Sequence, residues 1–275
     1  GDLSLGGLAR NVARHDDGGL SFDYRPGPGP VAVRITSVDP EDPIRDIRVF
    51  REDRADLIAA GALFDPAFIA DIRDLRSVRF MDWMDTNGSE QIVWQDRPKP
   101  DDFTFVRRGV PVEIMVQLAN QIGAEPWFTL PHMADDAYVR AFATHVRDHL
   151  DPRLPVRVEW SNEVWNFIFP QARWAAEQAE ARWGPGVSED GWMQFAGLRG
   201  AEVAGLWADV FGSGADRVIP VVSVHTGWPG LEAALLVAPL AVAEGLPPPS
   251  EAFRAYAVTG YFGTELGDEA NLERL

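Results

Sequence analysis

The hydrophobic pattern of this chain changes near residue 44. Before that point, apolar and polar residues alternate over residues 20–24 and 31–35, and a segment rich in Pro and Gly, residues 25–30, separates the two stretches. A period of two is typical of β-strands, and Pro-Gly segments form turns. We therefore expect residues 1–43 to form a short β-rich segment.

From residue 44 onward, short apolar runs alternate with segments of helical periodicity. The predicted strands are residues 47–50, 78–83, 126–130, 156–160, 218–224 and 256–261. The predicted helices are residues 115–122, 136–150, 171–182, 192–211 and 231–244. This alternation is typical of parallel sheets whose strands are joined by helices, so residues 44–275 are expected to form one domain.

Two parallel architectures fit this alternation, an open doubly wound sheet and a (β/α)8 barrel of the TIM type. No Gly-x-Gly-x-x-Gly or Walker-type loop follows a predicted strand, which argues against nucleotide binding. Polar and aromatic residues instead gather where several strands end, as a barrel active site requires. We therefore predict an α/β fold with a TIM-type barrel, truncated toward the C-terminus because strands seven and eight are not evident.

Composition narrows the range of partners. Acidic residues outnumber basic ones 42 to 25 and give a net charge of -17, which argues against a nucleic-acid partner. The absence of Cys excludes disulfides, thiolate zinc sites and Cys nucleophiles. No apolar run is long and uninterrupted enough to span a bilayer, so we expect no membrane partner. The expected ligand is neutral or cationic.

Residues 156–166 carry the strongest chemical signal. An apolar-alternating strand runs into Asn162 and Glu163, with Trp160 and Trp165 on either side. A partly buried carboxyl group beside an indole can keep its proton near neutral pH and serve as a general acid. Glu163 is therefore a candidate catalytic residue, although a Glu in a loop can also cap a helix or pair with an Arg. Glu159, earlier on the strand, is expected to form an ion pair rather than to react.

Three segments together resemble a known family. They are Arg-Phe-Met-Asp-Trp-Met at residues 79–84, Pro-Trp-Phe-Thr-Leu-Pro-His at 126–132 and Glu-Trp-Ser-Asn-Glu-Val-Trp-Asn at 159–166. The combination resembles the clan of retaining glycoside hydrolases with (β/α)8 barrels. It is more closely similar to bacterial hydrolase-like proteins often described as cellulose-binding. The resemblance spans roughly residues 44–263. We expect no cofactor and, since no His-x-His pair occurs, no metal.

The resemblance also implies roles for individual residues. In the clan, an Asn-Glu pair at the end of strand four supplies the acid/base, which carries over to Asn162 and Glu163. The clan has an Arg on strand two, often a His near strand three, and a Tyr or His on strand six. The matching positions here are Arg79, His132 and Tyr261. The clan's nucleophile, a Glu at the end of strand seven, has no counterpart, and Glu265 is not assigned to that role.

Tryptophans are further candidates for sugar binding, because indole faces stack on apolar surfaces such as the C–H groups of sugars. Trp165 lies beside Glu163, while Trp83 and Trp94 flank a loop rich in Asp, Asn and Pro, residues 84–105. Arg79 can keep a nucleophile ionised, or it can form a buried salt bridge. His132 can bind a sugar hydroxyl or orient Glu163, or it can be a structural histidine.

Three functions remain open at this point. The first is a secreted glycoside hydrolase that acts on an oligo- or polysaccharide with retention of configuration. The second is a noncatalytic carbohydrate-binding barrel, because the strand-seven carboxylate is not evident. A metal-dependent hydrolase that uses His132, Asp135 and Asp136 is the weakest, since His145 and His149 have no carboxylate to complete a metal site.

Overall fold

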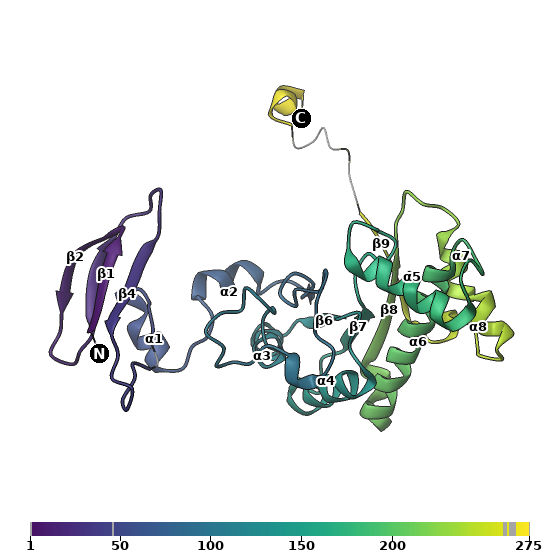
Figure 1. Cartoon of the computed structure of the whole chain (residues 1–275), viewed down its shortest axis with the longest axis horizontal. Helices are drawn as coiled ribbons and strands as arrows, with labels where there is room; N and C mark the ends of the chain where they lie inside the picture. The colour runs from purple at the N-terminus through teal and green to yellow at the C-terminus, as the bar shows by residue number, and fades with distance from the viewer. Residues whose placement is uncertain (1, 46, 261–262, 264–267, 275) are drawn as a thin grey trace. The chain divides into compact units, whose positions relative to one another are not determined.

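The computed structural model describes residues 2–45, 47–260, 263 and 268–274. The chain divides into two compact units, Gly1–Leu63 and Phe64–Leu275 (Figure 1). The N-terminal unit thus continues past residue 43 to Leu63. No helix among the described residues is both long and apolar enough to cross a membrane.

The N-terminal unit is built from antiparallel strand pairs. Its strands are β1 (Asp2–Gly7), β2 (Ala9–Arg14), β3 (Leu20–Tyr24) and β4 (Val31–Ser37), and β1 pairs with β4 while β2 pairs with β3. The predicted strands at 20–24 and 31–35 are confirmed. Gly7 has φ +69°, and a Cβ there would lie 2.1 Å from the Pro30 carbonyl oxygen, so the step between β1 and β2 requires glycine.

Short helical turns follow these strands, η1 (Glu52–Arg54) and α1 (Ala55–Ala59). The predicted strand at residues 47–50 is wrong, because that segment has no regular secondary structure. Burial in this unit is sparse. Ala9 is buried, whereas Val33 and Ile35 on β4 stay 42% and 45% exposed. The alternating pattern therefore forms strands here without a dense core.

The larger unit contains a parallel sheet of five strands in sequential order. The strands are β5 (Ser77–Arg79), β6 (Glu125–Leu130), β7 (Val156–Trp160), β8 (Val218–Val224) and β9 (Ala255–Val258). Figure 1 shows β6 to β9 side by side. Each matches a strand expected from the sequence, although β5 and β9 are shorter than predicted.

The TIM-type barrel predicted from the sequence, truncated toward the C-terminus, is wrong for the described residues. The sheet has five strands, and β5 and β9 are its edges rather than partners of each other. Alternation of strands and helices specifies parallel β/α units, but closure requires eight strands with a matched tilt and stagger. The structure is therefore an open mixed α/β fold with small antiparallel sheets.

One helix, α2 (Pro66–Ile72), precedes the parallel strands, and the other helices of this unit lie in the connections between them. These are α3 (Val112–Ile122), α4 (Asp136–His149), α5 (Pro170–Trp183), α6 (Gly191–Phe211), α7 (Leu231–Val237) and α8 (Pro239–Ala243). Short 3-10 turns are η2 (Trp94–Asp96), η3 (Gly212–Arg217), η4 (Pro249–Glu251) and η6 (Glu269–Arg274). The single helix expected at 231–244 is interrupted, since Ala238 has φ +44° and Pro239 starts α8.

One face of the sheet, which we call the covered face, packs against helices. Phe128 on β6 lies edge to face with Phe142 of α4, with ring centroids 5.1 Å apart, and 6.5 Å from fully buried Trp207 of α6. Val156 and Val158 on β7 join the same core. Complete burial of one such side chain contributes about 1.5–3 kcal/mol, so this face holds the larger unit together.

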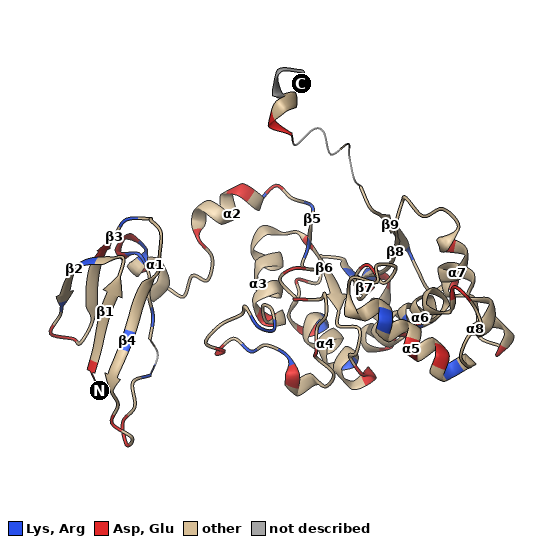
Figure 2. Ribbon diagram, turned by 45° about the horizontal axis from the view of Figure 1, so that its top comes forward, with Lys and Arg blue, Asp and Glu red and all other residues tan. Residues whose placement is uncertain are grey.

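The intervening residues of the strands form the opposite face, which we call the polar face. Arg79, Trp127 and Arg157 are register partners across β5, β6 and β7, so they point to the same side. Arg157 pairs with Glu125 of β6. Acidic residues occur on helices and loops of this unit (Figure 2). On the polar face, the acidic residues Glu125 and Glu159 each form an ion pair with an arginine.

Candidate functional site

The site begins where β7 ends in a strained turn. Ser161 and Glu163 both have positive φ angles, +60° and +42°. Such angles are uncommon for residues other than glycine and cost on the order of 1 kcal/mol or more each. Two such residues within a segment of three persist only when the surrounding structure holds the turn in place. Backbone strain of this kind clusters at functional sites.

Asn162, between these two residues, fixes the turn to its neighbours. Its Oδ1 accepts a hydrogen bond from Arg79 Nη2 at 2.9 Å, and its Nδ2 donates to Asn87 Oδ1 at 3.1 Å. Its main-chain oxygen accepts from Gln171 Nε2 of α5 at 2.8 Å. Both ends of the buried amide are therefore engaged, so Asn162 acts by positioning the turn.

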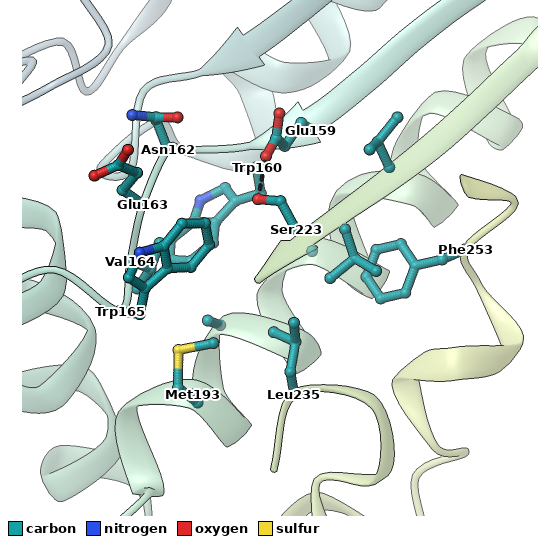
Figure 3. A pocket seen from close by; sticks show the side chains of 14 residues that line it. Glu159, Trp160, Asn162, Glu163, Val164, Trp165, Met193, Ser223, Leu235 and Phe253 are labelled. Carbon is teal, nitrogen blue, oxygen red and sulfur yellow. Dashed lines mark hydrogen bonds between the residues drawn. The ribbon is translucent and has the colours of Figure 1, made fainter. Parts of the chain in front are cut away.

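Glu159 is the centre of a second network on the polar face. Its Oε2 accepts hydrogen bonds from Arg79 Nη2 and Trp127 Nε1, both at 2.9 Å, and its Oε1 accepts from Ser223 Oγ at 2.5 Å (Figure 3). Its side chain is 2% exposed. The expectation that Glu159 forms an ion pair is confirmed, and Arg79 has the salt bridge considered as its structural role. Arg79 thereby links Glu159 to Asn162.

Glu163 itself is partly exposed and is held by its own loop. Its Oε2 accepts from Asn166 Nδ2 at 3.0 Å, and its main-chain oxygen accepts from Asn166 N at 2.8 Å. Figure 3 shows Glu163 and Asn162 at one side of the pocket and Glu159 with Ser223 farther along it. The two carboxylates thus differ. Glu159 is buried and engaged with cationic and neutral donors, whereas Glu163 lies toward solvent.

A small cavity lies between these groups and the helices. Its volume is about 20 Å³, and its lining includes Glu159, Glu163, Trp160, Trp165, Met193 and Phe253. A cavity needs roughly 10–15 Å³ to hold one water molecule, so this one has room for water rather than a pyranose ring. A sugar therefore has to approach Glu163 from the surface.

His132 follows β6 and is 3% exposed. Its ring lies edge to face with Trp174 of α5 at 5.5 Å, and its buried Nδ1 has no hydrogen-bond partner among the described residues. Burial lowers the pKa of His132 from 6.5 to about 4. The imidazole is therefore neutral at neutral pH, and its described contacts are those of a packed side chain.

The tryptophans predicted to bind sugar occupy different surroundings. Trp83 stacks on Phe68 at 6.3 Å and lies 5.6 Å from Phe80. Trp94 packs edge-on against α4, and the Arg97 guanidinium lies 4.2 Å from its ring centre. The structure thus places both indoles, Trp83 and Trp94, in packing contacts.

Of the remaining predicted residues, Trp165 comes together with Glu163. It lines the same cavity and lies edge to face with His225, with ring centroids 6.3 Å apart. Tyr261 and Glu265 lie outside the described residues. The structure therefore gathers Arg79, Asn162, Glu163 and Trp165 from the predicted set.

Sequence reasoning missed Asn87, Gln171, Trp127 and Ser223, which hold the two networks together. Gln171 Nε2 also donates to Asn87 Oδ1 at 2.7 Å, which links α5 to the loop after β5. Asn87 stands in an Asn-Gly pair, which marks a turn but names no partner. The other three sit on ordinary strand or helix positions, where periodicity alone gives no signal.

Within the part of the chain that the structure describes, no group of three or more His, Asp or Glu side chains is arranged to hold a metal ion. His145 and His149 stack on each other with ring centroids 4.1 Å apart.

Comparisons with models of protein families, with curated proteins and with solved structures find no match. The chemistry of the site therefore has to be argued from its own geometry.

Proposed function

We propose that this chain is a glycoside hydrolase of oligo- or polysaccharides in which Glu163 acts as general acid/base. The observation that supports this most is the placement of Glu163, which is partly exposed on a strained turn at the carboxyl end of a parallel strand. The turn is fixed through Asn162 to Arg79, Asn87 and Gln171. Trp165, which is buried, lines the same small cavity as the acid.

A retaining mechanism needs two carboxylates with different roles. A general acid protonates the leaving glycosidic oxygen, and in a retaining mechanism a second carboxylate about 5 Å away attacks the anomeric carbon. Glu159 is the other carboxylate that lines the cavity, but three donors already bind its two oxygens. We therefore assign Glu163 the acid/base role and assign no nucleophile among the described residues.

A second candidate function is noncatalytic carbohydrate binding by the same site. The engagement of Glu159 favours it, because a carboxylate with three hydrogen-bond donors is a poor nucleophile. This alternative predicts saturable binding of a polysaccharide without release of reducing ends.

The two functions separate in one experiment, hydrolysis and binding of a panel of aryl glycosides and polysaccharides. Loss of a general acid slows the reaction by about 10²-fold to 10⁴-fold, so Glu163→Gln is expected to lose activity by that factor. Glu177→Gln, the same change on an exposed position of α5, is the matched control and keeps activity.

Each outcome decides between the two functions. Equal rates for the parent and Glu163→Gln contradict the acid/base assignment. Saturable binding of a polysaccharide by the parent without turnover favours the noncatalytic alternative. Absence of both binding and turnover across the panel contradicts both functions.

A further inference from the structure

Aromatic side chains from loops far apart in the sequence meet near the candidate site. Phe167, in the loop after β7, lies edge to face with Trp192 at the start of α6, with ring centroids 5.4 Å apart. Trp192 in turn lies 6.0 Å from Trp228, in the loop after β8. Phe167 and Trp228 are 45% and 46% exposed. We call these three residues the aromatic strip.

The aromatic strip is continuous with the turn that carries Glu163. Trp165 lines the cavity beside Glu163 and lies edge to face with His225 at 6.3 Å. The main-chain oxygen of His225 accepts a hydrogen bond from Trp228 N at 3.2 Å. One aromatic contact and one main-chain hydrogen bond therefore connect Trp165, beside the proposed acid, to the residue that carries the exposed ring of Trp228.

The backbone around the strip is fixed in advance. Arg173 Nη1 of α5 donates to the Phe167 main-chain oxygen at 2.6 Å. In the second loop, Thr226 N donates to Thr259 Oγ1 at 3.1 Å, and the two hydroxyl oxygens lie 2.7 Å apart. Binding to rings on a backbone that is already ordered loses less conformational entropy than binding to a mobile loop.

The chemistry of the strip restricts its ligand. Large flat rings that are nearly half exposed, such as Phe167 and Trp228, suit the apolar C–H face of a sugar ring. The net charge of -17 disfavours a polyanionic chain such as a nucleic acid or an acidic polysaccharide. Since the cavity beside Glu163 has room only for water, binding energy for a long substrate has to come from a surface of this kind.

We propose that the aromatic strip binds a neutral polysaccharide chain beyond the residue cleaved at Glu163. That the ligand is a sugar rests on the proposed function. The strip adds the class of substrate, which is a neutral polysaccharide. Trp228 and Phe167 form the platform, while Trp192 supports them from α6. The strip thus sets preference for polymers over short glycosides and leaves proton transfer at Glu163 unchanged.

The test measures binding of soluble neutral polysaccharides, such as β-glucan, xylan and mannan, by affinity electrophoresis and calorimetry. Trp228→Ala and Phe167→Ala are expected to weaken binding about tenfold each, because each removes a large exposed ring. Trp228→Tyr keeps a ring and is expected to retain most of the affinity. Phe103→Ala is the control, since Phe103 is 89% exposed and lies outside the strip.

Hydrolysis of a short aryl glycoside by the same variants separates the strip from the acid. Weakened polymer binding by the alanine variants, with an unchanged aryl glycoside rate, supports the proposal. If the parent shows no turnover at all, weakened polymer binding by the variants still supports the strip, while the hydrolase function fails. Unchanged polymer affinity in both alanine variants overturns the strip but leaves Glu163 untouched. A parent that binds no polysaccharide of the panel overturns the strip as a glycan platform.

Discussion

The covered face and the polar face of the parallel sheet are stabilised in different ways. On the covered face, Phe128, Val156 and Val158 pack against helices as apolar volume. On the polar face, Glu159 and Arg79 contribute through specific donors and acceptors. The stability of the covered face depends on how completely apolar side chains fill the space. The stability of the polar face depends on whether each donor or acceptor has its hydrogen-bond partner. The candidate site grows from the second kind, at the carboxyl end of β7.

The largest expected effect comes from the covered face. Phe128→Ala removes a ring that contacts Phe142 and Trp207, and the free energy of unfolding is expected to fall by about 3–5 kcal/mol. Val258→Ala on edge strand β9, where Val258 is 54% exposed, is the control and is expected to cost less than about 1 kcal/mol. Urea unfolding measures both, and similar losses would show that burial does not distinguish these positions.

A buried polar group in the loop after β6 gives the next effect. His132 has its pKa lowered to about 4 by burial, against 6.5 when exposed. The unfolded chain therefore binds a proton more readily, so stability is complete above pH 6.5 and falls as the pH drops toward 4. The loss is on the order of 2–3 kcal/mol.

The pH dependence of unfolding in His132→Phe tests this assignment. The decline between pH 6.5 and pH 4 is expected to flatten in that variant relative to the parent. His145→Asn is the comparison, because the pKa of half-buried His145 is also lowered by burial and by His149. An unchanged pH profile in His132→Phe would mean that another group causes the decline.

The smallest effect concerns the pair Arg79 and Glu159. Glu159 is buried, but the Arg79 side chain is 31% exposed, so solvent weakens the pair and a coupling of about 1–2 kcal/mol is expected. Glu159→Gln, Arg79→Met and the double variant, compared by urea unfolding, measure that coupling. Additive losses would show that the polar face is stabilised without this ion pair, and would remove the distinction between the faces.

Some of the site could be predicted from the sequence because its signal is local. The alternation in residues 156–160 gives β7, and the residues directly after it include the Asn162–Glu163 pair. The hydrogen bond between Arg79 and Asn162 joins two different strand segments and has no local signal in the sequence. The hydrogen bonds that join Asn87 to Asn162 and Gln171, and Ser223 to Glu159, link residues 64 to 84 positions apart. Periodicity contains no information about such pairs.

The sequence by itself determined the five parallel strands, the helices that alternate with them, and the position of Glu163 just after a strand. Backbone geometry links these features to the spacing of apolar residues. Only the tertiary structure decided that the described sheet stays open with five strands and that residues 47–50 join no sheet. It also decided that Glu159 is buried among donors from other strands, while Glu163 is partly exposed and bonds within its own loop. Sheet closure and side-chain pairing depend on contacts between distant segments, which compete globally and leave no local pattern.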